Sequence, residues 1–184
     1  MTEEPKLKYF DQLKFAMEWL ADKPDTIFVG QTVGCPGTFM YPTLKDVSET
    51  KRIEFPVNES FQMQFSIGLA LAGYVPITVY PRQNFLLLAT GDMVNMLDKI
   101  AAISGNRVLP KMIIRVAVGP DSPVHPGHQH VGNYAEAFRK MFTWIDVFEV
   151  TEAVDILPAY TYAYNRNDKR ATLIIEHGNS YATK

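Results

Sequence analysis

Short apolar segments alternate with helix-like segments along nearly the whole chain, and this alternation limits the possible folds more than any other feature of the sequence. The clearest apolar segment is 111–118, KMIIRVAV, which predicts a buried strand. Further strands are expected at 26–30, 51–55, 75–80, 147–150 and 171–176. Strands that alternate with helices are typical of a parallel sheet covered on both faces. The sequence therefore predicts an α/β fold, a three-layer sandwich with a mostly parallel central sheet.

The segments between the strands are predicted to be helices. Before the segment 59–72, Asn58 stands where a side chain can cap a helix start, and Gly73 stands where a helix commonly ends. A long amphipathic helix is expected over 85–103, and the remaining helices at 7–20, 134–142 and 151–165. No repeat, low-complexity segment or internal linker divides the chain, so we expect residues 1–184 to form a single domain.

Three loops or turns are expected at one edge of the sheet. Residues 31–48 and 119–132 are rich in glycine and proline, which predicts loops, and a turn at 81–85 follows another predicted strand. In open parallel sheets, ligands bind at the carboxyl ends of the strands. These three segments, together with Glu59 after the strand at 51–55, are therefore expected at the ligand-binding edge.

Composition argues against several classes of function. The 18 Lys and Arg residues are scattered and are balanced by 20 Asp and Glu residues, so neither a nucleic acid nor a membrane is an expected partner. The longest apolar stretch, 65–80, is interrupted by glycine and proline and is too short to span a bilayer. Cys35 is the single cysteine, which excludes an internal disulfide and fits a reducing compartment. Residues 1–12 lack the apolar core of a signal peptide, so we expect a cytoplasmic protein.

Glu59 is the one charged residue between Glu54 and Arg82, and it stands at the start of a helix rich in small residues. A carboxylate in apolar surroundings is costly unless it has a partner. One explanation is structural, because the dipole and the free N–H groups of a helix N-terminus stabilise an acid. The other is that Glu59 shares a proton with a ring nitrogen of a ligand. Position alone leaves both explanations open.

Three of the four histidines lie close together, at His125, His128 and His130. They could be exposed loop residues, or they could bind zinc, for which imidazole is a common ligand. Zinc is disfavoured because Pro126 and Gly127 break any helical spacing and the chain has no HExxH motif. The favoured functional explanation is that one or two of the imidazoles donate or orient protons at the strand edge.

Tyr80 and Phe85 flank the turn that follows a predicted strand. Phe85 could belong to the core, but a ring at this edge could also stack on a planar heterocycle. The sequence contains no GxxxxGK[ST] and no GxSxG, and the glycines after the first strand do not form GxGxxG at a helix start. Common nucleotide-binding enzymes and hydrolases are therefore disfavoured.

Several features follow one another in a fixed order: Glu59 at a helix start, the run GLALAG, a strand that contains Pro76, and an aromatic turn with Asn84 and Phe85. This ordered set resembles the pyrimidine-binding domain of thiamine diphosphate enzymes. It is most similar to the β subunit of pyruvate dehydrogenase-type 2-oxoacid dehydrogenases, and next to the central domain of transketolase. Upstream, IFVGQTVG is similar to the family's strand ending in GEDVG. Downstream, QHVGNY at 129–134 is similar to the QHSQxY of the β subunit.

The resemblance implies the thiamine diphosphate-binding fold and a cofactor site. Glu59 would hydrogen-bond a pyrimidine nitrogen of thiamine diphosphate and so activate its aminopyrimidine. Phe85 would stack on the same ring. Tyr80, at the end of one predicted strand, and Gln31, directly after another, would also contact the cofactor.

The resemblance also implies a role for the histidines. His130 would serve the reacting carbonyl of a small 2-oxo acid or a sugar phosphate. His128 and His125 are possible catalytic companions, because the transketolase version of this loop also carries a histidine. Two alignments of the loop stay open.

The chain departs from the family in two respects. The family's GEDV is GQTV here, so Gln31 and Thr32 replace both acids. The GDG…NN motif that holds the diphosphate through Mg²⁺ is absent, and we expect no metal ligand in this chain. The resemblance therefore implies that the chain is one half of a split enzyme and lacks the diphosphate-binding and C-terminal domains. Such a chain is expected to be inactive on its own. Its partner would be a diphosphate-binding subunit in a homodimer or heterotetramer. The alternative is a non-catalytic regulatory or dimerisation domain that keeps the fold without cofactor turnover.

Overall fold

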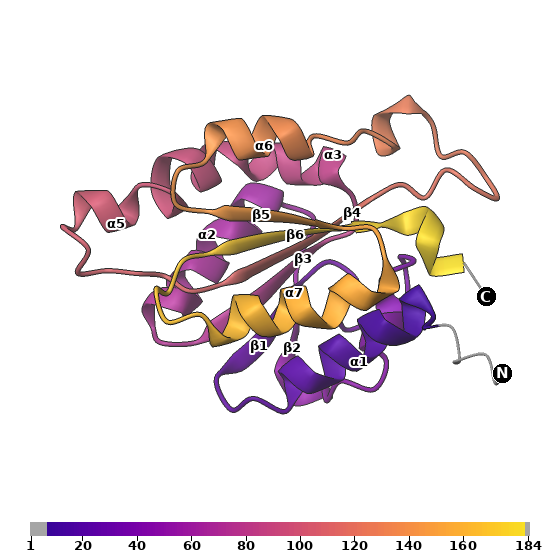
Figure 1. The fold of residues 1–184 in the computed structure, drawn as a ribbon, viewed down its shortest axis with the longest axis horizontal. Coiled ribbons are helices and arrows are strands. Elements are labelled where there is room, and N and C mark those ends of the chain that lie inside the picture. The colour runs from indigo at the N-terminus through magenta and orange to yellow at the C-terminus, as the bar shows by residue number, and fades with distance from the viewer. Residues whose placement is uncertain (1–6, 183–184) are drawn as a thin grey trace, which may run out of the picture.

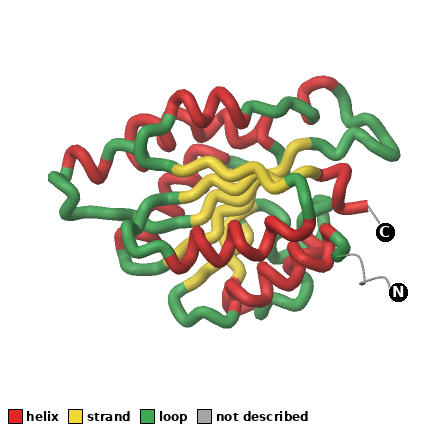
Figure 2. Tube along the Cα trace, in the orientation of Figure 1, coloured by secondary structure: helices red, strands yellow, loops and turns green. Residues whose placement is uncertain are grey.

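In the described part of the chain, six parallel strands form one sheet at the centre of the fold (Figures 1 and 2). Their spatial order is β2-β1-β3-β4-β6-β5. The strands of this computed structural model are β1 (Thr26–Gly30), β2 (Arg52–Glu54), β3 (Val75–Tyr80), β4 (Ile113–Val118), β5 (Asp146–Val150) and β6 (Thr172–His177). The predicted α/β sandwich is confirmed, and every pairing among these strands is parallel. The structure describes residues 7–182. Residues 1–6, half of the segment expected not to be a signal peptide, lie outside the described part, as do 183–184.

Helices cover both faces of the sheet (Figure 1). On one face α1 (Tyr9–Ala21) and α7 (Ala153–Asn165) bury their apolar sides, and on the other face α2 (Glu59–Leu71) and α6 (Ala135–Met141) do the same. Short 3-10 turns lie at Tyr41–Leu44, Glu49–Lys51, His128–His130 and Gly178–Ala182. Within residues 7–182, none of the helices has the length and apolar character needed to cross a bilayer.

Helix α2 begins and ends where its sequence predicts. The Asn58 side chain accepts a hydrogen bond from the backbone N–H of Phe61 (3.0 Å), which caps the helix start. At the other end Gly73 adopts φ +96°, a left-handed conformation that favours glycine. The N–H of Tyr74 then donates to the carbonyl of Leu69 (3.1 Å), which closes the helix end. The cap at Asn58 makes Glu59 the first residue of α2, and together the two signals set the length of this helix.

The prediction of one long helix over 85–103 is wrong. The segment consists of α3 (Gln83–Leu86), a 3-10 turn at Leu87–Ala89, α4 (Thr90–Asp92), a π-helical turn at Met93–Leu97 and α5 (Ile100–Ile103). In the π turn the N–H of Asp98 donates to the carbonyl of Met93 (2.9 Å) instead of the carbonyl four residues back. The cause is tertiary, because Asp98 is bound to a segment far away in the sequence.

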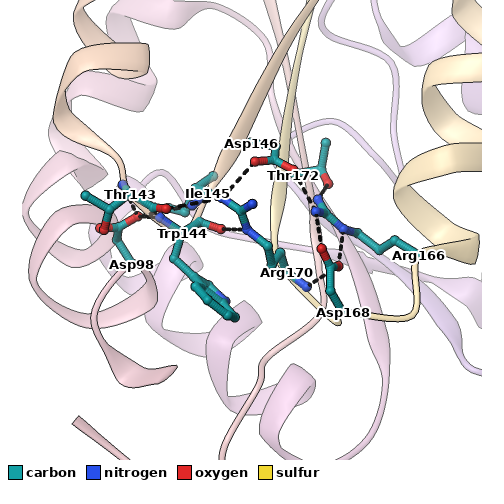
Figure 3. A network of polar contacts seen from close by, with 9 residues as sticks. All are labelled: Asp98, Thr143, Trp144, Ile145, Asp146, Arg166, Asp168, Arg170 and Thr172. Carbon is teal, nitrogen blue, oxygen red and sulfur yellow. Dashed lines mark hydrogen bonds and ion pairs between the residues drawn. The ribbon is translucent and has the colours of Figure 1, made fainter. Parts of the chain in front are cut away.

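Asp98 is buried at the amino edge of the sheet, where its carboxylate binds the backbone segment that leads into β5 (Figure 3). One carboxylate oxygen accepts from the backbone N–H groups of Thr143 (2.9 Å), Trp144 (2.6 Å) and Ile145 (3.1 Å). The other pairs with Lys99 (2.6 Å) and the Thr143 hydroxyl. Burial alone would raise the pKa of Asp98, but these hydrogen bonds lower it to about 2.

A second polar network at this edge continues from β5 to β6 (Figure 3). The Arg166 guanidinium is almost fully buried and pairs with Asp146 and Asp168, each at 2.6 Å. It also donates to the hydroxyl of Thr172 (2.9 Å), and Arg170 pairs with Asp146 from the other side (2.8 Å). The starts of β5 and β6 are therefore held together by charged groups.

A buried ion pair joins the middle of β4 to the carboxyl end of β6. The Arg115 guanidinium donates to both carboxylate oxygens of Glu176 (2.8 and 3.1 Å), and both side chains are fully buried. The hydroxyls of Tyr160 and Tyr181 donate to the same carboxylate. Burial alone would lower the pKa of Arg115, but the Glu176 carboxylate raises it well above its usual range. Sequence inspection placed both residues in strands and missed their pairing.

Replacing Asp98 with Asn should lower the free energy of unfolding by about 2 kcal/mol at neutral pH. Because the folded carboxyl group is more acidic than its ordinary pKa of 3.8, its stabilisation is complete above that pH and is lost as the pH falls towards 2. Urea unfolding at several pH values measures both effects. The exposed Asp22→Asn is the control, and an equal loss in the two variants would contradict this assignment.

Replacing one member of the Arg115–Glu176 pair should lower the free energy of unfolding far more than expected from replacing both members together. We expect Arg115→Met or Glu176→Gln to lose about 3–5 kcal/mol of unfolding free energy, because each leaves a charge or its partners buried and unpaired. The double variant Arg115→Met with Glu176→Gln should lose much less than the sum of the two single losses. A double-mutant cycle by urea unfolding tests this, and additive losses would show that the two groups do not interact.

Candidate active site

Glu59 lies at the carboxyl edge of the sheet, where the strand ends meet. The N–H of Phe55 donates to the carbonyl of Gly30 (2.9 Å), so β2 ends beside β1, and the capped start of α2 follows at once. The Glu59 residue is only 7 % exposed. Its Oε1 accepts one long hydrogen bond from the Gln31 amide (3.3 Å), and no basic side chain within residues 7–182 forms an ion pair with it. The site thus contains a buried carboxylate with a single neutral partner.

Tyr80 supports the turn that carries Glu59. It is the last residue of β3 and is fully buried, and its hydroxyl donates to the backbone carbonyl of Glu59 (3.0 Å). Burial raises the pKa of the Tyr80 hydroxyl well above its usual range, so the group stays a donor. The structure therefore places this predicted cofactor-binding residue behind Glu59, with its hydroxyl already bound to the chain.

Phe85 and His130 come together although 45 positions separate them. Their ring centres are 5.5 Å apart and the rings meet at 62°, an edge-to-face arrangement. Phe85 is half-buried on α3, and His130 is half-buried on the short turn His128–His130. The Nδ1 atom of His130 is buried and has no hydrogen-bond partner among the described residues.

His125 and His128 lie apart from the contact between Phe85 and His130. Both are exposed, and their rings lie 5.5 Å from one another. The N–H of Gly127 donates to Nδ1 of His125 (3.0 Å), which orders the loop locally. Throughout residues 7–182, no three His, Cys, Asp or Glu side chains are arranged to hold a metal ion, so the zinc alternative has no ligand set there.

Glu54 is a residue of this region that sequence inspection missed. The backbone N–H groups of Thr32 and Gly34 each donate to its carboxylate (2.7 Å), so Glu54 on β2 holds the turn after β1. This is the turn in which Gln31 and Thr32 replace two acids of the resembling family. A signal was available, because Glu54 lies near the end of the strand predicted over 51–55, and that strand end was expected at the same edge of the sheet as the turn.

Gln62 is another residue that the sequence pattern did not reveal. It is fully buried one turn after Glu59, and its amide donates to the Thr78 hydroxyl (2.9 Å) and to the carbonyl of Val79 (3.0 Å). These bonds tie α2 to β3 beside the end of β1. The signal was a polar residue on the apolar side of the predicted helix, and it can be found in the sequence only once that side is known.

Tyr80→Phe should lower the unfolding free energy by about 1 kcal/mol, because the carbonyl of Glu59 loses a buried donor. Tyr74→Phe is the matched control, since Tyr74 is exposed. Urea unfolding compares the two variants. Equal stability of both variants would show that the Tyr80 hydroxyl does not hold the Glu59 turn.

Comparison with known proteins relates this arrangement to one group of folds. No protein-family model matches the sequence, and no curated protein matches it. Among solved structures, a split-gene transketolase described as an inactive β4 tetramer superimposes with a TM-score of 0.70 at 13% identity, over 94% of this chain and 52% of its own. Transketolase from Campylobacter jejuni subsp. jejuni NCTC 11168 gives a TM-score of 0.69 at 16% identity, over 95% of this chain and 26% of its own. This chain thus spans about half of one and a quarter of the other, and its fold is the α/β fold found in transketolase chains.

Proposed function

We propose that this chain is the pyrimidine-binding subunit of a split thiamine diphosphate enzyme, located in the cytoplasm. The observation that carries the proposal is the environment of Glu59, a carboxylate 7 % exposed whose one hydrogen-bond donor among residues 7–182 is a neutral amide at 3.3 Å. A buried carboxylate is costly without a partner, and a protonated ring nitrogen would provide one. The likeness to transketolase chains supports the proposal at the level of the fold.

The residues present at this edge fit an aminopyrimidine ring. The Oε1 atom of Glu59 accepts only the long bond from Gln31, and the half-buried ring of Phe85 can stack on a flat heterocycle. Nδ1 of His130 and Nε2 of Gln83 are buried without partners among the described residues. Since buried polar atoms are usually hydrogen-bonded, these atoms are available to a polar ligand.

The chemistry divides between the cofactor and the chain. Thiamine diphosphate, when bound, supplies the nucleophilic carbon and the electron sink. Glu59 holds a proton at the pyrimidine nitrogen, in a site that excludes bulk water. Phe85 fixes the plane of the ring. His130 holds or donates a proton at the carbonyl oxygen of a small 2-oxo acid or a sugar phosphate.

We assign the diphosphate and its Mg²⁺ to a second chain. Residues 7–182 offer no cluster of metal ligands, and the GDG…NN motif is absent from the sequence. Exposed apolar side chains of Val57 and Phe61 flank Glu59, and the space outside Gly68 on the same helix is open. We assign this face of α2 to the diphosphate-binding subunit, as in a heterotetramer built from two kinds of chain.

The second candidate function is a non-catalytic regulatory or dimerisation domain. The observation in its favour is the loss of both acids in the turn after β1, which Glu54 now holds from outside. Calorimetric titration with thiamine diphosphate and Mg²⁺, with and without the diphosphate-binding chain of a split transketolase, separates the two functions. Absence of binding in every mixture would favour the regulatory domain.

Glu59→Gln should lower the kcat of the reconstituted complex roughly 100-fold or more, because a neutral amide cannot hold the proton. Steady-state kinetics measures the loss, and circular dichroism shows whether the fold is kept. Glu152→Gln is the matched control, since Glu152 is exposed and stands before α7. A Glu59→Gln complex with the activity of the wild type would refute the role of Glu59.

A further inference from the structure

Three consecutive residues at the start of α3 hold the segment that carries His130. Arg82, Gln83 and Asn84 each form hydrogen bonds with this segment, at 130, 132 or 134. The next residue along the chain is Phe85, whose ring meets that of His130. The ring contact at the proposed cofactor site is therefore backed by a row of hydrogen bonds.

Arg82 connects the two ends of the segment 119–130, which carries His125, His128 and His130 and is called the histidine loop below. Its Nη1 donates to the carbonyl of Gly119 (2.8 Å) directly after β4, and to the carbonyl of His130 (2.9 Å) eleven residues later. No carboxylate within residues 7–182 pairs with Arg82, and burial lowers the pKa of its guanidinium. This half-buried charge contacts backbone carbonyl groups and the Phe39 ring (5.6 Å). Burying it has a cost, and the ordering of this loop is what the structure gains from it.

Gln83 and Asn84 extend the same attachment. The N–H of Tyr134 donates to the side-chain oxygen of Gln83 (2.5 Å), and the N–H of Gly132 donates to that of Asn84 (3.3 Å). The Asn84 amide in turn donates to the Tyr134 hydroxyl (3.2 Å). Alternate residues of the segment 130–134 are therefore bound, and a shift by one residue would break every bond at once.

We infer that Arg82 and Asn84 are positioning residues, which keep His130 in register with Phe85 so that its imidazole serves the reacting carbonyl. The inference rests on the proposed function, because it gives the register a catalytic purpose. A catalytic group displaced by about 1 Å can lose a large part of its effect, so the register matters more for turnover than for folding. Both residues act through His130.

Hydrogen exchange on the chain alone tests whether these residues hold the loop. In Arg82→Met the amides of 128–134 should exchange roughly tenfold faster, while those of 113–118 keep their protection. The control is Arg107→Met, because Arg107 is an exposed arginine between α5 and the start of β4 whose side chain donates to the nearby Ser104 carbonyl. Wild-type exchange of 128–134 in Arg82→Met would overturn the inference.

Asn84 provides a finer pair of variants. Asn84→Asp keeps the oxygen that accepts from Gly132 and loses the donor to Tyr134, whereas Asn84→Ala loses both. The Gly132 amide should therefore exchange faster in Asn84→Ala and stay protected in Asn84→Asp. Wild-type protection of this amide in Asn84→Ala would show that Asn84 does not hold the segment.

Kinetics of the reconstituted complex then tests the catalytic purpose. In Arg82→Met we expect kcat to fall at least tenfold with an unchanged Kd for thiamine diphosphate, and Arg82→Lys to recover part of the loss. Wild-type kcat in Arg82→Met, in a complex that Glu59→Gln inactivates, would overturn the positioning role. If Glu59→Gln stays fully active, the proposed function fails, and the catalytic purpose fails with it. The exchange data still show separately whether Arg82 and Asn84 hold the loop.

Discussion

The buried ion pair between Arg115 and Glu176 is the interaction on which the arrangement of the sheet and one helix layer depends. Burying two charges is costly, and their mutual attraction repays this cost only with good geometry and additional hydrogen bonds. Here α7 supplies the Tyr160 hydroxyl and the last turn supplies that of Tyr181. From α1, the Tyr9 hydroxyl donates to the last carbonyl of β5 (2.7 Å) and accepts from the first N–H after Glu176 (3.0 Å). The strand register and the packing of helices on this face are therefore set together. They also set the position at which β4 ends and the histidine loop begins.

The carboxyl edge shows how the chain departs from the family it resembles. An acid beside Glu59 would repel its carboxylate, whereas Gln31 donates a hydrogen bond to it. Glu54, from the neighbouring strand, binds two N–H groups of this turn and holds its backbone. The change in sequence therefore alters the charge around Glu59, while the turn here is held by a carboxylate from β2. This is why the replacement of both acids does not by itself decide between the catalytic and the regulatory proposal.

Much of the fold follows from local pattern. The strand at 26–30 and the strand at 75–80 lie where the apolar runs predict them, because buried parallel strands are apolar along their whole length. Helix α2 was bounded correctly by a capping Asn58 and a left-handed Gly73, which are local signals. The segment 85–103 was predicted wrongly for a different reason. Its helical periodicity is real, but the Asp98 carboxylate binds N–H groups 45 to 47 residues further along the chain. The regular α-helix is interrupted by a π turn just before Asp98, which lets the side chain reach these groups.

The sequence by itself determined the alternation of strands and helices, the start of α2 and the isolation of Glu59, because spacing and capping act within a few residues. The tertiary structure alone decided which polar groups meet. It set His130 against Phe85 and left His125 and His128 exposed, and it turned the Tyr80 hydroxyl onto the backbone of Glu59. It also joined Arg115 to Glu176 across 61 residues. Such pairings depend on strand order and on how each loop leaves the sheet, and neither leaves a periodic signal in the chain.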